Sequence, residues 1–287
     1  MSLAIAFIGY GEVGQLFARE LAAKPDLTIA VYDILFEDAR KRESLANIAR
    51  ASGVRAGATL QDAIRGADIV ISAVTAESAI SAARAATEYL APDQIYIDLN
   101  SVSPATKTTI AEAATSRGAN FVEFAVMAPV AGTGIATPVL AGGERAEEIA
   151  ARLNPLGMKI KVASREIGVA SATKLCRSIV IKGMEALMVD LSLAGAATGV
   201  LPAVLASLSA SYPGMDWAQL VATMPSRVTR HGVRRAAEMR EAAMMMEENG
   251  FNGALLTAIA DRHARHAAEA KAAGAQPQTK PEAQPAS

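Results

Sequence analysis

The sequence lacks several features that mark particular classes of protein. Its single cysteine, Cys176, excludes an intramolecular disulfide and fits a reducing compartment. It has three histidines and no CxxC, HExxH or GxSxG pattern, which argues against a metal site and against a serine-hydrolase nucleophile. The formal net charge is −1, so the chain has no basic footprint for nucleic acid or for an anionic membrane. We therefore expect neither a metal nor a nucleic-acid partner.

Long hydrophobic runs are also missing. No apolar stretch reaches the roughly 18 residues, free of charges and helix breakers, that a membrane span needs. The first apolar run is short and has no basic segment before it, unlike a secretory signal. We therefore expect a cytoplasmic protein that does not interact with membranes. Its 287 residues, 51% of them hydrophobic, suit one large domain or two modest ones.

That first apolar run, Leu3–Ile8, leads directly into a glycine-rich segment that precedes a helical pattern. A G-x-G-x-x-G motif between a strand and a helix is the dinucleotide-binding fingerprint. Its first glycine makes the tight turn, its second lets the backbone approach a pyrophosphate, and its third lets the helix pack closely. The helix N-terminus offers N–H groups to the phosphates. We predict that the whole motif contacts the cofactor: Gly9, Tyr10, Gly11, Glu12, Val13 and Gly14.

A second signal follows at the end of the next predicted strand, Leu27–Tyr32, where Asp33 stands. A carboxylate at this place can accept hydrogen bonds from the adenosine ribose, and its charge would repel a 2′-phosphate. The pattern therefore favours NAD over NADP. The alternative is a glycine-rich turn followed by a solvated aspartate. Val74 and Thr75, after another predicted strand, are expected to line the cofactor cleft.

The remaining pattern predicts an α/β protein with two domains. Strands and helices alternate over residues 1–163, which indicates a Rossmann-type, doubly wound, mostly parallel sheet that binds NAD. Residues 164–271 are helical in pattern and predict an all-α domain for substrate binding and dimerisation. Residues 272–287 are rich in Pro, Gln and Ala and are expected to form a disordered tail.

The helix predicted after Gly168 is apolar on every side and should be buried. Even so, it carries one polar stripe that contains Lys174, Ser178, Lys182 and Glu185. A lysine on such a helix can reach solvent or pair with a carboxylate. Alternatively, partial burial can lower its pKa and make it a general acid or base near neutral pH.

Four segments, in order, resemble the β-hydroxyacid dehydrogenase family, which includes 3-hydroxyisobutyrate, tartronate-semialdehyde and 6-phosphogluconate dehydrogenases. The first is the glycine motif, and residues 98–104 (DLNSVSP) resemble the family's D-x-S-T-V-S-P segment. Residues 122–129 (VEFAVMAP) stand where the family has D-A-P-V-S-G-G, and residues 168–178 resemble G-x-G-x-x-x-K-x-x-x-N. The resemblance implies an NAD-dependent oxidoreductase that acts on the CH–OH group of a hydroxy acid or related alcohol. It makes Lys174 the catalytic lysine and places Ser101 and Asn100 against the nicotinamide ribose or the substrate.

The chain departs from the family where substrate is held. The Ser-Gly-Gly segment that binds a substrate carboxylate falls on Met127-Ala128-Pro129, and proline cannot donate a backbone hydrogen bond. Ser178 takes the place of the family's asparagine and is expected to be catalytic together with Lys174 and Ser101. The family's late Lys-Asp pair falls on Ala237-Glu238, in a stretch that also holds His231. We expect substrate to contact Met127, Ala128, Arg177, His231 and Glu238. These departures identify a divergent branch, and we expect them to give a larger, partly apolar substrate.

Two other functions fit the same sequence. One is an imine reductase, because related folds reduce C=N bonds and the altered positions would suit another electrophile. The other is a non-catalytic NAD-binding protein. We also expect a homodimer built on residues 168–266, since the helical domain is too apolar to bury itself alone. Cys176 is expected to pack in the core, and His263 and His266 are expected to be solvated.

Overall fold

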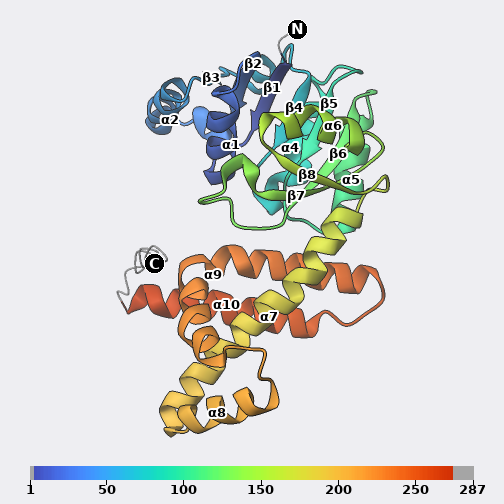
Figure 1. The fold of residues 1–287 in the computed structure, drawn as a ribbon. Coiled ribbons are helices and arrows are strands. Elements are labelled where there is room, and N and C mark those ends of the chain that lie inside the picture. Colours follow the sequence, from blue (N-terminus) through green and yellow to red (C-terminus); the bar gives the residue numbers. More distant parts are fainter. Residues whose placement is uncertain (1–2, 274–287) are drawn as a thin grey trace. The chain divides into compact units, whose positions relative to one another are not determined.

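A computed structural model describes residues 3–273 of the chain. These residues form two compact units, the first ending at Lys174 and the second beginning at Leu175. The first unit combines a sheet with helices, and the second contains helices (Figure 1). Most of the tail predicted for residues 272–287 lies outside the described residues, and the last helix continues to Ala272.

The first unit is built on an eight-stranded sheet in the order β3-β2-β1-β4-β5-β6-β7-β8. Neighbouring strands are parallel except for β6 and β7, which are antiparallel. This confirms the doubly wound, mostly parallel sheet that the sequence predicts. The strands are β1 (Leu3–Ile8), β2 (Leu27–Tyr32), β3 (Arg55–Ala56), β4 (Ile69–Ser72), β5 (Ile95–Asp98), β6 (Asn120–Val126), β7 (Pro138–Gly142) and β8 (Lys159–Ser164).

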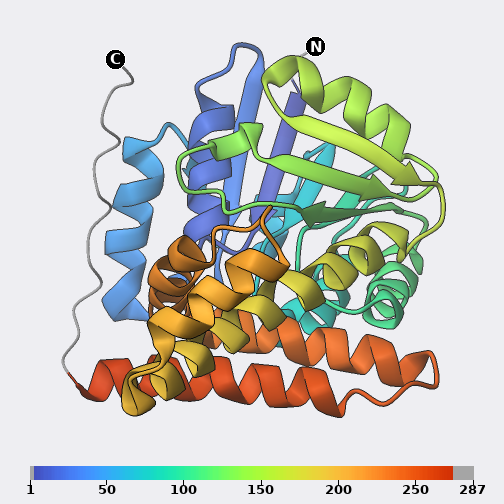
Figure 2. The same ribbon diagram turned by 60° about the horizontal axis from the view of Figure 1, so that its bottom comes forward.

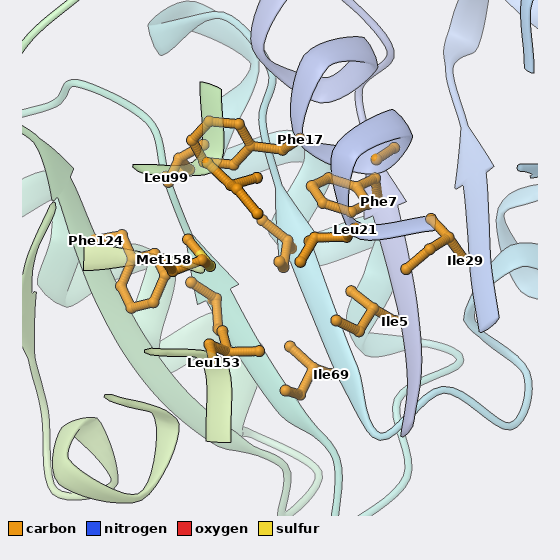
Figure 3. Close-up of a cluster of buried hydrophobic side chains, with 14 of the residues drawn as sticks. Ile5, Phe7, Phe17, Leu21, Ile29, Ile69, Leu99, Phe124, Leu153 and Met158 are labelled. Carbon is orange, nitrogen blue, oxygen red and sulfur yellow. The ribbon is translucent and has the colours of Figure 1, made fainter. Parts of the chain in front are cut away.

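Helices pack on both faces of this sheet (Figure 1), so its central strands are mostly apolar. Figure 3 shows part of the core on one face, where Phe7 and Ile69 from the strands belong to the same buried cluster as Phe17 and Leu21 from α1. The side chain of Ser103 caps α5 by accepting a hydrogen bond from Thr106 N at 3.2 Å. The helices are α1 (Glu12–Ala22), α2 (Ala39–Ala51), α3 (Leu60–Ile64), α4 (Ala79–Thr87), α5 (Pro104–Thr115) and α6 (Ala146–Leu153).

The second unit is helical. Its elements are α7 (Val169–Thr198), whose first residues belong to the first unit, α8 (Leu201–Ser211), α9 (Trp217–Glu248) and α10 (Ala254–Ala272). Helices α9 and α10 run side by side (Figure 2). Gly232 permits this close approach, because a Cβ atom there would lie 2.5 Å from the carbonyl oxygen of His263.

Three predictions about burial in this unit are wrong. His263 is fully buried instead of solvated, and its Nε2 atom lies 2.9 Å from Lys182 O on α7. Cys176 is exposed instead of packed in the core. Helix α7 is not buried on every side, since Val180 and Leu187 are 60% and 64% exposed. Within residues 3–273, no helix is both long enough and apolar enough to span a membrane.

Candidate active site

The glycine-rich turn follows β1, the strand that pairs with β2 on one side and β4 on the other. Gly9 has φ +93°, and a Cβ atom there would lie 2.4 Å from Ala73 O. A Cβ on Gly14 would lie 2.2 Å from Gly9 O, whereas a Cβ on Gly11 would have no atom of residues 3–273 within 4 Å. The first and third glycines are therefore required by the protein's own packing, and the second borders open space. This cradle, at the point where the strand order reverses, fits a dinucleotide pyrophosphate.

Asp33 links the end of β2 to this turn. One carboxylate oxygen accepts a hydrogen bond from Tyr10 N at 2.6 Å, and the other accepts a hydrogen bond from Leu35 N at 2.9 Å. Each oxygen keeps a second lone pair that can accept a ribose hydroxyl. The Tyr10 side chain lies in the core against Phe36, so only the backbone of this motif residue is available to a cofactor.

The segment after β4 lies against the same turn. A Cβ atom on Gly9 would approach Val74 Cγ1 to 3.0 Å, and Thr75 is exposed next to it. Thr75 Oγ1 donates to Ser78 Oγ at 3.1 Å. The two residues predicted to line the cofactor cleft are therefore adjacent to the glycine motif, as the topology requires.

A buried polar network lies at the end of β5. Lys107 Nζ donates to Asp98 Oδ2 at 2.5 Å, and both side chains are 0% exposed. Asp98 Oδ1 accepts from Asn100 Nδ2 at 2.5 Å, and the same nitrogen donates to Ser72 Oγ at 3.1 Å. Because a carboxylate can only accept, these bonds determine the orientation of the Asn100 amide. The network holds the segment that carries Ser101.

Lys174 reaches this segment from the second turn of α7, and its Nζ donates to Ser101 Oγ. The two residues are 73 positions apart in sequence, so the contact is a product of the fold. Both are partly exposed, which leaves them accessible to a ligand. The structure thus joins two of the three residues that the sequence predicts to be catalytic.

The third, Ser178, belongs to a buried charged cluster in the helical unit. Its hydroxyl accepts from Lys182 Nζ at 2.9 Å, and Lys182 also pairs with Glu238 at 2.7 Å. Arg235 pairs with Glu185 at 2.6 Å in the same cluster, and burial raises the pKa of this glutamate. Two residues predicted to hold substrate, Arg177 and His231, are exposed on the same unit.

The segment that replaces the family's carboxylate anchor directly follows β6. Met127 N donates to Pro138 O at 2.9 Å, which continues the pairing of β6 with β7. Pro129 has no N–H group, so of these three residues only Ala128 could offer a backbone donor. The structure therefore provides little here that could bind a carboxylate.

Sequence reasoning missed two buried charged residues, Lys107 and Glu123. Lys107 occupies the apolar stripe of its helix together with Ile110, Ala111 and Ala114. Glu123 stands inside β6 among apolar residues, and its side chain is 0% exposed. Both residues could have been found from the sequence, because each places a charge at a position that the apolar pattern assigns to the core.

Comparison with known proteins agrees with this architecture. Residues 4–164 match the NAD binding domain of 6-phosphogluconate dehydrogenase, and residues 196–266 match a domain of unknown function, DUF1932. A conserved hypothetical protein from Sinorhizobium meliloti is 37% identical over 96% of this chain and 92% of its own, with a TM-score of 0.81. The NAD-dependent L-serine dehydrogenase of Pseudomonas aeruginosa is 25% identical over 75% of this chain and 71% of its own.

A more distant structure, the 3-hydroxyisobutyrate dehydrogenase of Mycobacterium tuberculosis with L-serine, shares the fold. It is 21% identical, with a TM-score of 0.75 over 94% of this chain and 95% of its own. The family match covers more than half of the chain, and its glycine cradle has the geometry that this match requires. The chain belongs to the family defined by the NAD-binding domain of 6-phosphogluconate dehydrogenase, and NAD is its cofactor.

Proposed function

We propose that this protein transfers a hydride between NAD and a hydroxy acid or related alcohol, with Lys174 as general acid and base. The observation that carries the proposal is the bond from Lys174 Nζ to Ser101 Oγ. It places an ammonium group beside a hydroxyl at the end of β5, in the same unit as the glycine cradle. Such a pair can bind a substrate oxygen and exchange its proton.

Each part of the first unit has a role in this reaction. NAD, when bound, supplies or accepts the hydride at its nicotinamide ring. The cradle at Gly11 holds the pyrophosphate, and the Asp33 carboxylate accepts hydrogen bonds from the hydroxyls of the adenosine ribose. During alcohol oxidation Lys174, in its neutral form, takes the hydroxyl proton, and in the reverse direction its ammonium returns this proton. The ammonium also stabilises negative charge that develops on the substrate oxygen.

The segment Met127-Ala128-Pro129 determines which substrates bind well. A hydrogen bond to a charged group contributes roughly 1.5–3 kcal/mol, which corresponds to about one to two orders of magnitude in affinity. Small acids that depend on this anchor, such as 3-hydroxyisobutyrate or serine, should therefore bind weakly. A substrate with an apolar portion against Met127 would regain part of that affinity.

A panel of hydroxy acids, followed through the absorbance of NADH, tests the proposal. We expect turnover that is better on larger, partly apolar acids than on three- and four-carbon acids. In the Lys174→Ala variant kcat should fall by about 10²–10⁴-fold, while NAD still binds. A near-normal kcat in this variant would reject the catalytic role of Lys174.

An imine reductase is the second candidate, and the loss of the carboxylate anchor at residues 127–129 favours it. A cyclic imine carries no carboxylate and would not need that anchor. Assay of cyclic imines with NADH beside the hydroxy-acid panel separates the two activities. Binding of NAD without turnover on either panel would identify a non-catalytic protein.

We also propose that two copies of the chain associate through the helical unit. Val180 and Leu187 lie seven residues apart on α7, so they share one face of the helix, and both are mainly exposed. Exposed apolar side chains along one helix face are typical of a subunit interface. A symmetric dimer would bury both copies of this face.

A further inference from the structure

Glu123 makes an unusual connection between the sheet and helix α7. Its Oε1 atom accepts Gly168 N at 2.7 Å and Ala170 N at 3.0 Å. These N–H groups lie at the start of α7, where a helix cannot satisfy them internally. A carboxylate at this position also interacts favourably with the helix dipole. The strand thus holds the first turn of the helix through one side chain.

The neighbouring strand is shaped to allow this connection. Gly142 on β7 pairs with Glu123 on β6, and a Cβ atom on Gly142 would lie 2.5 Å from Glu123 Oε1. Any larger residue at position 142 would therefore displace the carboxylate. The absence of a side chain here opens the path from β6 to the start of α7.

The same turn of α7 packs against the segment that carries Ser101. Gly168 has φ +96°, and a Cβ atom there would approach Pro104 Cβ to 3.1 Å. Lys174 follows Gly168 by six residues, about 9 Å along a helix axis. Its ammonium meets Ser101 Oγ only if the first turn of α7 is held at the correct height and rotation.

We infer that Glu123 is a positioning residue that places Lys174 against Ser101, an inference that rests on the proposed function of Lys174. Glu123 acts on the helix and not on the substrate. A displacement of a reacting group by about 1 Å can lower a rate by about 100-fold. Loss of the Glu123 contact should therefore reduce kcat while the binding of NAD at the glycine cradle is retained.

Two substitutions separate the hydrogen bonds from the side chain as a whole. Oε1 accepts both bonds, and within the described residues Oε2 has no hydrogen-bond partner. Glu123→Gln retains an acceptor for both N–H groups, so it should keep most of the activity. Glu123→Ala removes the acceptor, and its kcat should fall by about 100-fold. Gly142→Ala disturbs the carboxylate from the opposite side and should change kcat in the same direction.

Thr87→Val is the matched control. Thr87 is buried in the same unit, and its hydroxyl bonds Ala83 O at 2.8 Å and Ala113 O at 2.9 Å, between α4 and α5. This variant should lose stability but keep its kcat. An effect of Glu123→Ala that merely reflected destabilisation would appear in Thr87→Val as well, and that result would overturn the inference.

A measurement without turnover distinguishes this inference from the proposed function. The rate of Lys174 acylation, followed by mass spectrometry, and amide hydrogen exchange over residues 168–174 report on the start of α7 directly. Both should increase in Glu123→Ala and Gly142→Ala and stay unchanged in Thr87→Val. Unchanged labelling and exchange in Glu123→Ala would overturn the positioning role. Altered labelling, together with full activity of Lys174→Ala, would support that role and reject the proposed catalysis.

Discussion

Replacing Lys107 with methionine should destabilise the first unit by about 3–5 kcal/mol, the usual cost of removing one partner of a buried ion pair. The ammonium of Lys107 lies 2.5 Å from Asp98 Oδ2 and 2.9 Å from Asp98 O, and neither side chain has any solvent exposure. Methionine has similar length and leaves no large void. The cost therefore comes from the carboxylate, which would be left in the core without a counter-charge.

The double variant with Asp98→Asn tests this explanation. It removes both charges, so no uncompensated ion remains, and it should be more stable than Lys107→Met alone. Urea unfolding followed by circular dichroism gives the free energy of unfolding of the wild type, the two single variants and the double variant, which together form a double-mutant cycle. Lys161→Met, at an exposed position on β8, serves as the control and should change stability by no more than about 0.5 kcal/mol. If the two single effects simply add in the double variant, the pair is not coupled and the reasoning is wrong.

Three further predictions concern the cofactor, pH and assembly. Asp33→Ser should narrow the preference for NAD over NADP in kcat/KM, and a wild-type preference for NADP would contradict the role of this carboxylate. Burial lowers the pKa of His263, so the unfolded chain binds protons more readily and stability should fall as the pH drops below about 6.5. Thermal unfolding should show a weaker pH dependence in His263→Gln, with no such change in His266→Gln. Light scattering should show a dimer for the wild type and a monomer for the double variant Val180→Glu, Leu187→Glu; a monomeric wild type at micromolar concentration would refute the proposed interface.

Local chemistry explains which parts of the fold were predictable. The bounds of β1 and β2 agree with the sequence pattern because each strand is a short run of apolar and β-branched residues that ends at a turn residue, Gly9 or Asp33. The glycine turn was predictable because its backbone leaves no room for a Cβ atom at positions 9 and 14, and the sequence has glycine at both. The cap at Ser103 is equally local, since the donor lies three residues away.

Contacts between distant residues could not be predicted in the same way. Helix periodicity marks Lys107 as a core position but does not name Asp98 as its partner, because that depends on how α5 packs on β5. His263 lies on a helix rich in polar residues, and its burial depends on contacts between distant residues: its ring bonds Lys182 O on α7, and Gly232 lets α9 approach its backbone. Val180 and Leu187 on α7 are exposed because the other helices of this unit leave that face uncovered, and the apolar pattern of the helix does not show which face that is.

The strand β6 connects the two parts of the proposed function, proton transfer by Lys174 and the choice of substrate. Glu123, within the strand, connects to the start of the helix that carries Lys174. Met127, directly after the strand, uses its N–H to continue the pairing with β7. Under the proposed function, substitutions in the segment after the strand would alter what can hold a substrate, whereas the bonds from Glu123 to the start of α7 use a different residue. Because the two proposed roles fall on different residues of β6 and the segment after it, substrate preference could change here without loss of the proposed proton-transfer group.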